Sequence, residues 1–318
     1  MKKILLGVFF GAALLLNGQA RAQDAAIWPQ TQTKTPQPAN AQAFTPTLYK
    51  VTGETRNSTM YLLGSIHELT EANSTFPEVV LRNFDRADVA IFELPEEDLD
   101  ADPLAMFRKL APHMMLPGDD LLTNYVSTEE IQQLSKLLTD VPDTAMLKFR
   151  PWVVEMFLDL NDAKVAGMRA EHGIDLRLVK RGKSQGKKQI GLEQLDEQIG
   201  FLSSDPLDVQ AKRLKKNLSD RRSKPNEAAE QTEKLLRNWV DGDVNELSND
   251  FAKFREEDPV LFDRIGKQRN HNWLAKLKPH LAKPQTVFVT VGTLHLLGDN
   301  GLVKLLKDAG YKVERVER

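Results

Sequence analysis

Two apolar stretches near opposite ends of the chain share one pattern. Residues 61–67 read YLLGSIH and residues 287–295 read VFVTVGTLH, so each run of apolar, β-rich residues leads to a glycine and, three positions later, a histidine. Short apolar runs of this kind predict buried strands, and the glycine lets the backbone turn sharply as the strand ends. The pattern therefore predicts that His67 and His295 lie at the tips of two buried strands.

A helix and a second strand are predicted after each of these stretches. In the first copy, residues 77–86 have the pattern of a helix, and DVAIFE at residues 88–93 reads as a strand that ends in Glu93. In the second copy, residues 302–309 predict a helix and residues 311–316 a final strand. Strand–helix–strand units join parallel strands. The predicted fold class is therefore α/β (α+β), with a mixed central sheet built from two βαβ-like halves.

The remaining segments complete a single predicted domain over residues 47–318. Residues 47–51 and 59–66 are β-like runs joined by a polar connection that suits a hairpin. A large helical insertion is predicted over about residues 100–280, broken by one short strand at residues 189–193. Open α/β sheets carry their chemistry at the carboxyl ends of strands, where both histidines are expected.

The first residues have the pattern of an export signal. Lys2 and Lys3 precede an apolar run, and Ala20-Arg21-Ala22 gives a small-residue cleavage pattern, so residues 1–22 are predicted to be a signal peptide. Residues 23–46 are rich in Gln, Thr, Pro and Ala and predict a flexible lead-in. We therefore expect a periplasmic protein with no stable membrane anchor after cleavage.

Composition narrows the choice of partners. The chain has no cysteine, which excludes a disulfide framework, and its net charge of −2 provides no field that would attract nucleic acid. The basic stretch at residues 212–224 is followed by acidic residues, which is typical of a solvated helical face. We expect a peptide or protein substrate and no nucleic acid, and the sequence leaves the oligomeric state open.

His67, His295 and Glu93 are the residues we expect to hold a metal. Imidazoles and carboxylates bind divalent transition metals, and a site with three protein ligands keeps a position open for water. Such a metal lowers the pKa of bound water and polarises a carbonyl, so the expected reaction is metal-assisted hydrolysis. The prediction rests on topology, because the chain carries no HExxH motif.

Other polar residues are candidates for supporting roles. Glu68 could act as a general base, and Asp175 or Glu193 could orient a histidine. Arg269, with Asn270, could hold a substrate carboxylate or a developing oxyanion. The histidines without a repeated context are read as ordinary, and they are His113, His271 and His280.

An ordered set of motifs resembles the TraB/PrgY/GumN family, which includes the Tiki proteins. The motifs are GSIH, DVAIFE, GIDLRL, IGLEQLDEQ, WVDGD at residues 239–243, RN at residues 269–270, and GTLH. The resemblance runs from about residue 48 to the C-terminus.

This resemblance implies a fold similar to the erythromycin-esterase and ChaN-like group. It also implies metalloprotease chemistry of the Tiki type, with the two Gly-x-x-His histidines and the glutamate matching Glu93 as the site, and manganese or cobalt as the metal. PrgY-like members are associated with blocking peptide pheromones. This sequence lacks the long membrane anchor of the Tiki proteins, so their protein substrates are not carried over.

The leading functional prediction is a periplasmic metal-dependent hydrolase, with a metallopeptidase as its more specific form. His67, Glu93 and His295 would hold manganese, cobalt or zinc, and Arg269 would assist the substrate. Two alternatives stay open: a non-catalytic protein that sequesters a peptide or small ligand, and a metal-free esterase-like hydrolase that uses a histidine as base.

Overall fold

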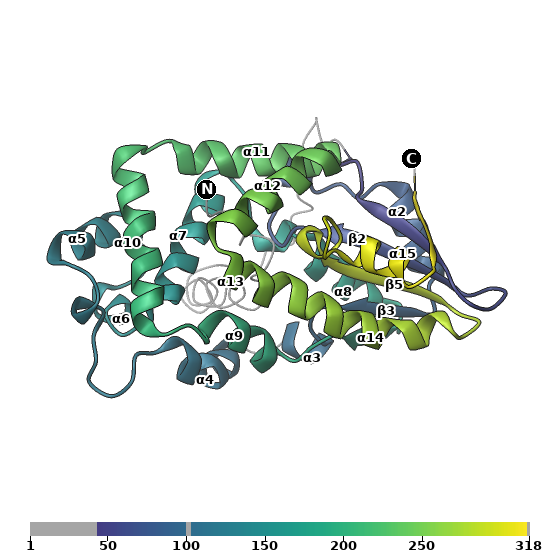
Figure 1. The fold of residues 1–318 in the computed structure, drawn as a ribbon, viewed down its shortest axis with the longest axis horizontal. Helices are drawn as coiled ribbons and strands as arrows, with labels where there is room; N and C mark the ends of the chain where they lie inside the picture. Colours follow the sequence, from purple (N-terminus) through teal and green to yellow (C-terminus); the bar gives the residue numbers. More distant parts are fainter. Residues whose placement is uncertain (1–42, 100–102, 317–318) are drawn as a thin grey trace, which may run out of the picture.

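The computed structural model describes residues 43–99 and 103–316. The predicted signal peptide and residues 23–42 of the predicted lead-in lie outside these ranges. Within them the chain forms a six-stranded sheet with the order β4-β3-β5-β2-β1-β6 (Figure 1). The strands are β1 (Leu48–Thr52), β2 (Thr59–Ser65), β3 (Val89–Phe92), β4 (Lys188–Gly191), β5 (Thr286–Gly292) and β6 (Lys312–Arg315).

The sheet is mixed, as the sequence predicts. The four strands β4, β3, β5 and β2 run parallel to one another, and β1 pairs antiparallel with both β2 and β6. The β1–β2 pair is the predicted hairpin. The two strands that carry the Gly-x-x-His motifs are direct neighbours, with Ser65 opposite Gly292. Their carboxyl ends therefore meet at one edge of the sheet.

The two strand–helix–strand units are interleaved. The first unit runs from β2 through α2 (Glu78–Arg86) to β3, yet β5 of the second unit lies between these two strands. The second unit runs from β5 through α15 (Leu302–Asp308) to β6, which pairs at the far side of β1. β3 thus has the same direction as β2, as expected, but its partners are β5 and β4.

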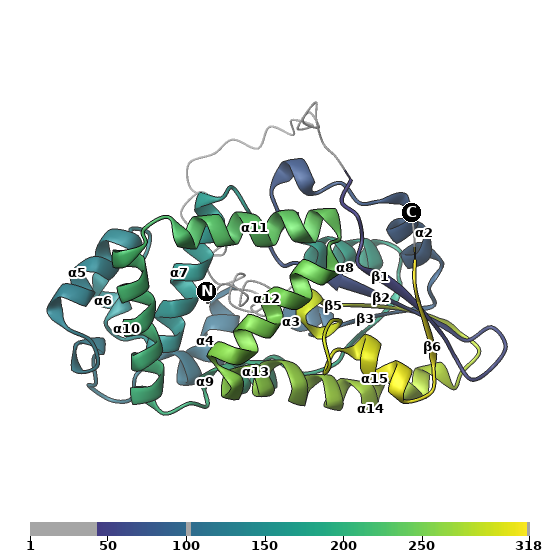
Figure 2. The ribbon, with the colours of Figure 1, turned by 45° about the horizontal axis from the view of Figure 1, so that its top comes forward.

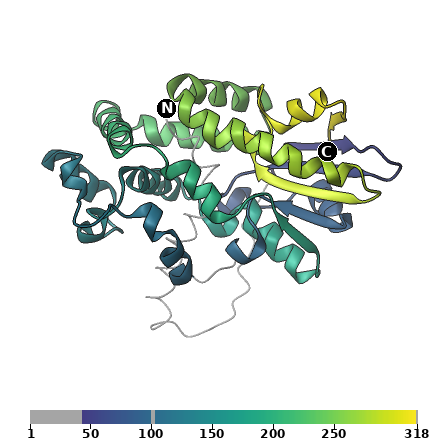
Figure 3. The same cartoon turned by 60° about the horizontal axis from the view of Figure 1, so that its bottom comes forward.

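Helices cover both faces of the sheet. On one face, Phe84 of α2 packs edge-on against Phe288 of β5, with ring centroids 5.3 Å apart, and α8 (Ile174–Ser184) adds Leu178 to the same core. On the other face, α14 (Arg269–Leu281) and α15 pack against the opposite side of β5 (Figures 2 and 3). Buried apolar side chains on both faces are the main source of stability for such a layered domain.

The other helices extend beyond the carboxyl edge of the parallel strands, where Figures 1 and 2 show α5, α6, α7 and α10 farthest from the sheet. Ser127 and Glu130 form the capping box that opens α5.

None of the helices in the two described ranges is both long enough and apolar enough to cross a membrane. The elements are η2 (Glu71–Asn73), α3 (Glu96–Leu99), α4 (Pro103–Met114), η3 (Leu122–Asn124), α5 (Thr128–Leu137), α6 (Asp143–Met146), α7 (Pro151–Val165), η4 (Ala170–His172), α9 (Leu195–Ser203), α10 (Leu207–Ser223), α11 (Glu227–Asp241), α12 (Val244–Glu257), α13 (Pro259–Phe262), the π-helix η5 (Asp263–Gln268) and η6 (Thr293–His295).

Candidate functional site

Four polar residues follow the carboxyl ends of the four parallel strands. His67 follows β2, His295 follows β5, Glu93 follows β3 and Glu193 follows β4. All four are buried, with His295 fully inaccessible to solvent. Buried polar side chains need partners, so the hydrogen bonds of this cluster define what it can do.

Trp239 of α11 ties the two Gly-x-x-His motifs together. Its indole Nε1 donates to the carbonyl oxygen of Gly64 (3.2 Å) and to Thr293 Oγ1 (2.9 Å), and Thr293 Oγ1 donates to the carbonyl oxygen of Ser65 (3.0 Å). A Cβ at Gly64 would lie only 2.8 Å from Thr293 Oγ1. The glycine is therefore required for the close approach of the two strand ends.

His67 is oriented by a carboxylate. Its Nδ1 lies 2.8 Å from Asp175 Oδ2, and Ser65 Oγ donates to Asp175 Oδ1 (2.8 Å). A carboxylate can only accept, so the proton of a neutral His67 ring is on Nδ1 and the basic lone pair is on Nε2. This arrangement prepares His67 to take up a proton, since Asp175 stabilises the imidazolium that results.

The position of Asp175 depends on a close contact at the start of α8. The backbone N–H of Ile174 donates to the carbonyl oxygen of Ile66 (3.1 Å). A Cβ at Gly173 would lie 2.0 Å from the carbonyl oxygen of His67, which no side chain could tolerate. Gly173 thus lets the first turn of α8 dock directly onto the strand end that carries His67.

Arg269 is fully buried at the centre of a second group of residues. Its Nη2 donates to Glu93 Oε2 (2.7 Å) and Glu193 Oε1 (2.5 Å), and its Nε donates to Glu193 Oε2 (3.1 Å). Its Nη1 contacts the carbonyl oxygen of Ile265 (3.2 Å) and His295 Nε2 (3.1 Å). All five N–H groups of the guanidinium are therefore engaged within the protein. Burial lowers the pKa of Arg269, but Glu193 and Glu93 outweigh it, and the net shift is upward.

The carboxylate oxygens of Glu93 and Glu193 accept further hydrogen bonds from several residues. Glu93 Oε1 accepts from the backbone N–H of Gly292 (2.7 Å), and Gln198 Nε2 donates to both Glu93 Oε2 and Glu193 Oε1 at 3.2 Å. Trp273 Nε1 donates to Glu193 Oε2 (3.2 Å). Burial raises the pKa of Glu93, and the attraction of Arg269 opposes this shift. We refer to Glu93, Glu193, Gln198 and Trp273, together with Arg269 and His295, as the arginine network.

His295 differs from His67 in both of its partners. Its Nδ1 lies 2.7 Å from Asn270 Oδ1, and its Nε2 faces the Arg269 guanidinium. Because an arginine can only donate, Nε2 accepts and Nδ1 carries the proton. Burial, Arg269 and His67 together hold the pKa of His295 well below its usual value. His295 is therefore a neutral imidazole with both nitrogens engaged.

Glu68 is a buried carboxyl group beside His67. It is 7 % exposed, and its Oε2 has no hydrogen-bond partner among the described residues. Burial raises the pKa of Glu68 to about 7, although His67 and Arg169 pull it down. The group can therefore exchange a proton near neutral pH.

The metal set expected from the sequence can be compared with these contacts. His67, Glu93 and His295 have suitable donor types, but Arg269 contacts both Glu93 and His295, and the remaining donor atoms of those two residues are also engaged. Among the described residues, no three His, Asp or Glu side chains are grouped so that they could hold a metal ion. In this arrangement the donor set does not fit a metal without displacement of Arg269.

The sequence-based candidates fall into two groups. His67, Asp175 and Glu68 form the first group. Glu93, Glu193, Arg269 and His295 belong to the arginine network, which Asn270 adjoins through its contact with His295 Nδ1. His113, His271 and His280 are outside both. Ser65, Gln198, Trp239 and Trp273 were not singled out for the site. Trp239 belongs to WVDGD, Ser65 to GSIH and Gln198 to IGLEQLDEQ, so the motifs themselves carried a signal for these three residues.

Comparison with known proteins gives one family and a few relatives. A sequence profile described as the TraB/PrgY/gumN family matches residues 47–315. The chain is 28 % identical to the uncharacterised protein YbaP of Escherichia coli K12 over 253 residues, which are 79 % of this chain and 89 % of YbaP, and the values for YbaP of Shigella flexneri are the same. An uncharacterised protein of Treponema pallidum is 27 % identical over 45 % of this chain and 43 % of its own length. No solved structure matches the chain.

Proposed function

The chain belongs to the TraB/PrgY/gumN family, and from that premise we propose that it is a hydrolase in which His67 activates water for attack on a carbonyl carbon. The observation that carries this proposal is the 2.8 Å contact between His67 Nδ1 and Asp175 Oδ2, supported on the other carboxylate oxygen by Ser65. A histidine oriented in this way is a general base suited to neutral pH.

The reaction needs one base and one acid. His67 Nε2 removes a proton from water as the water oxygen bonds to the carbonyl carbon, and the C–O or C–N bond to the leaving group then breaks. Glu68, whose pKa is about 7, supplies a proton to the leaving group. A neighbouring base and acid in opposite roles are typical of acid–base catalysis.

The arginine network has a positioning role in this proposal. Arg269 holds Glu93, Glu193 and His295 together, and these residues follow three of the four parallel strands. Because every N–H of Arg269 has a partner, its contribution is to fix the strand ends that face the substrate rather than to bind the substrate directly. No step is assigned to a metal, since the donor set does not fit one with Arg269 in this position.

The test is hydrolysis of a panel of chromogenic esters and short peptides by the wild type, His67→Gln and His295→Gln, before and after chelation. We expect turnover that survives chelation and falls in His67→Gln. Elemental analysis of the same samples is the control.

Two outcomes would overturn this form of the proposal. Near-stoichiometric manganese, cobalt or zinc that is lost in His67→Gln, with activity that depends on it, would favour the metallohydrolase expected from the sequence. Tight retention of a peptide by the wild type without any turnover would favour the sequestering protein.

We further propose that the protein acts in the periplasm, on the basis of the export signal at residues 1–22. Fractionation of cells that express the full chain tests this. The expected result is a processed protein released with the periplasmic fraction, and an unprocessed cytoplasmic protein would contradict it.

A further inference from the structure

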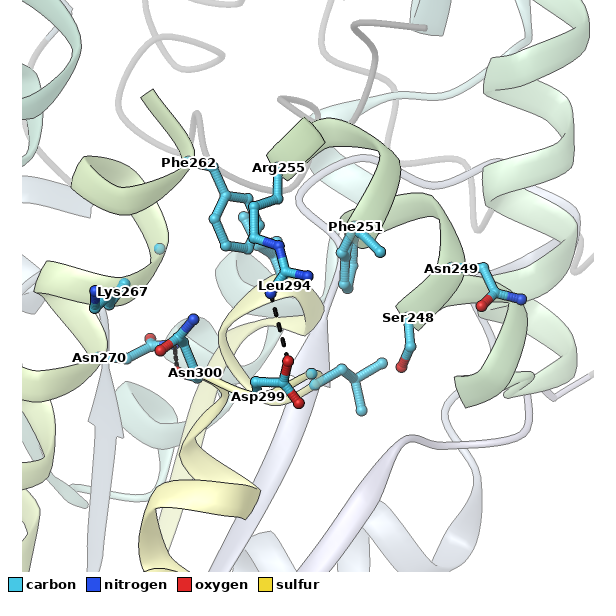
Figure 4. Close-up of a pocket in the computed structure, with 14 residues that line it drawn as sticks. Ser248, Asn249, Phe251, Arg255, Phe262, Lys267, Asn270, Leu294, Asp299 and Asn300 are labelled. Carbon is cyan, nitrogen blue, oxygen red and sulfur yellow. Dashed lines mark hydrogen bonds and ion pairs between the residues drawn. The ribbon is translucent and has the colours of Figure 1, made fainter. Parts of the chain in front are cut away.

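A cavity of about 210 Å³ is lined by Asn270, the hydrogen-bond partner of His295, and by Leu294, the residue before His295 (Figure 4). We call it the cavity behind His295. It is formed by α12, by η5 with the start of α14, and by the loop that follows η6. Its volume is smaller than the roughly 300–1,000 Å³ typical of sites for drug-sized ligands. The cavity therefore suits one amino-acid residue or a group of similar size.

The lining combines an apolar floor with a cationic rim. Phe251, Phe262 and Leu294 supply aromatic and aliphatic surface, and Arg255 and Lys267 line the same space. Such a combination fits an apolar group that carries a negative charge.

Among the residues that the structure describes, Arg255 and Lys267 form ion pairs with exposed carboxylates. Arg255 Nη1 lies 3.4 Å from Asp299 Oδ2, as the dashed line in Figure 4 shows, and Lys267 Nζ lies 3.5 Å from Asp263 Oδ2. Asp299 is 82 % exposed and Asp263 is 49 % exposed. Exposed pairs of this length contribute little free energy, so a ligand carboxylate can replace them.

The cavity shares one side chain with the candidate site. Asn270 lines it, and the same side chain accepts from His295 Nδ1 through Oδ1 and donates to the carbonyl oxygen of Asn300 through Nδ2. Leu294, the residue before His295, forms part of its floor. A group bound here would therefore lie one side chain away from His295.

A second cavity on the other side of α14 provides a contrast. It has a volume of about 350 Å³ and is lined by Trp273 and Phe201, but its ionisable residues are Glu193, Glu197 and Lys276. Two acidic groups against one basic group disfavour an anion. In the cavity behind His295, by contrast, the two basic groups Arg255 and Lys267 are paired with the exposed carboxylates of Asp299 and Asp263, which a ligand carboxylate can replace. Charge therefore selects the cavity behind His295 for a carboxylate.

We propose that this cavity binds the C-terminal residue of a peptide, with its apolar side chain on the Phe251, Phe262 and Leu294 floor and its α-carboxylate between Arg255 and Lys267. In naming the bound residue as part of a substrate, this inference rests on the proposed hydrolase function. It narrows the substrates to short peptides that end in an apolar residue.

Binding is tested without turnover by calorimetric titration with N-acetyl-L-leucine. The expected dissociation constant is on the order of 1 mM for a ligand of this size. N-acetyl-L-leucine amide, which lacks the carboxylate, and N-acetyl-L-aspartate, which lacks the apolar side chain, should each bind at least roughly fivefold more weakly. Arg255→Gln and Lys267→Gln should weaken binding of N-acetyl-L-leucine by a similar factor, and Ala252→Trp, which fills the cavity, should abolish it.

Matched variants separate this proposal from general damage. Lys253→Gln removes an exposed cation from α12, the helix that carries Arg255. Gly200→Phe fills the second cavity, where a Cβ at Gly200 meets no atom within 4 Å. Both should bind N-acetyl-L-leucine as the wild type does. Three results would overturn the proposal. They are equal binding of the acid and its amide, unchanged binding in Ala252→Trp, and no detectable binding at ligand concentrations well above about 1 mM.

The two proposals fail separately. His67→Gln should bind N-acetyl-L-leucine normally, because His67 does not line the cavity. Specific binding by a protein without hydrolytic activity supports the cavity assignment and counts against the hydrolase. Hydrolysis of peptides regardless of their C-terminal residue, with no effect of Arg255→Gln, would support the hydrolase and count against the cavity assignment.

Discussion

At the scale of single residues, one motif produces two chemically different histidines. His67 is hydrogen-bonded to the carboxylate of Asp175, which stabilises its protonated form. His295 is hydrogen-bonded to the amide of Asn270 and the guanidinium of Arg269, which keep it neutral. The difference arises from the helices that meet each strand end, α8 for His67 and α14 for His295. The Gly-x-x-His tetrapeptide alone therefore does not define the role of its histidine.

Asp175→Asn tests the role of the carboxylate beside His67. The amide keeps the shape but cannot stabilise an imidazolium, so we expect kcat to fall roughly 10²- to 10⁴-fold with little change in KM. Steady-state kinetics measure this. Asp85→Asn is the control, because Asp85 of α2 forms a surface ion pair with Arg181, which lies on α8 as Asp175 does. The kcat of this variant should stay within about twofold of the wild type. Equal losses in the two variants would contradict a specific role for Asp175.

Glu68 should make stability depend on pH. Its pKa rises from 4.5 to about 7 on folding, so its contribution is fully present below about pH 4.5 and is lost as pH rises through about 7. The free energy of unfolding should therefore fall by about 3 kcal/mol between these values from this group alone. Urea titrations at several pH values measure it, and Glu68→Gln should flatten the slope. A wild type and a variant with the same slope would count against the shifted pKa.

Arg269→Met should be among the most destabilising substitutions in the chain. It leaves Glu93 and Glu193 buried without their cation, and removal of one partner from a buried ion pair costs about 3–5 kcal/mol. The double variant Arg269→Met, Glu93→Gln should recover part of the loss, because one buried charge is also removed. Urea unfolding provides the free energies, and additive losses would show that the two residues do not interact.

The residues of the site were more predictable than their roles. Strand ends placed His67, Glu93, Glu193 and His295 at one edge, since apolar runs that stop at polar residues are visible in the sequence. The sequence suggested Arg269 as a substrate ligand, but four of its five hydrogen bonds join it to residues that are distant along the chain, namely Glu93, Glu193 and His295. The engagement of all the guanidinium N–H groups depends on tertiary packing, so the sequence around Arg269 does not indicate it.

At the scale of elements, α8 and the π-helix η5 determine the geometry of the site. The first turn of α8 docks onto the backbone of His67 through Gly173. The π-helix η5 contains the cavity residue Lys267 and leads directly into α14, which begins at Arg269. π-Helical turns often occur at functional sites. Here the irregular turn directly precedes the residue that holds the network together.

A pair of glycine substitutions tests the docking of α8. Gly173→Ala would put a Cβ 2.0 Å from the carbonyl oxygen of His67, so we expect lower activity and a loss of stability of about 1–3 kcal/mol. Gly200→Ala in α9 meets no atom within 4 Å and should raise stability by about 0.5–1 kcal/mol with activity unchanged. Thermal unfolding and kinetics on both variants measure this. Similar behaviour of the two would contradict the close contact.

Strand existence was predicted better than strand order. The hairpin, the mixed sheet and the parallel direction of β2 and β3 are confirmed. The insertion of β5 between β2 and β3 was not foreseen, because all three are apolar and any order would bury them. Their order depends on contacts between segments that are far apart in the chain, which periodicity does not encode.

At the scale of the whole molecule, the site and the core are parts of one packed body. Trp239 and Trp273 are both buried and both donate to the site. We therefore expect the loss of activity in urea to coincide with the red shift of tryptophan emission, as in a two-state transition. Activity that disappears well before the emission changes would indicate that the site opens locally.

The central place of β5 has a consequence for synthesis. The ribosome makes this strand after about nine-tenths of the chain has emerged, so until then β2 and β3 each lack the neighbour that separates them in the final sheet. A nascent chain in that state exposes unpaired strand edges and must be shielded from aggregation. A product that stops before residue 286 would lack His295 and the middle of the sheet together, so incomplete chains should be degraded and should not persist as weakly active fragments.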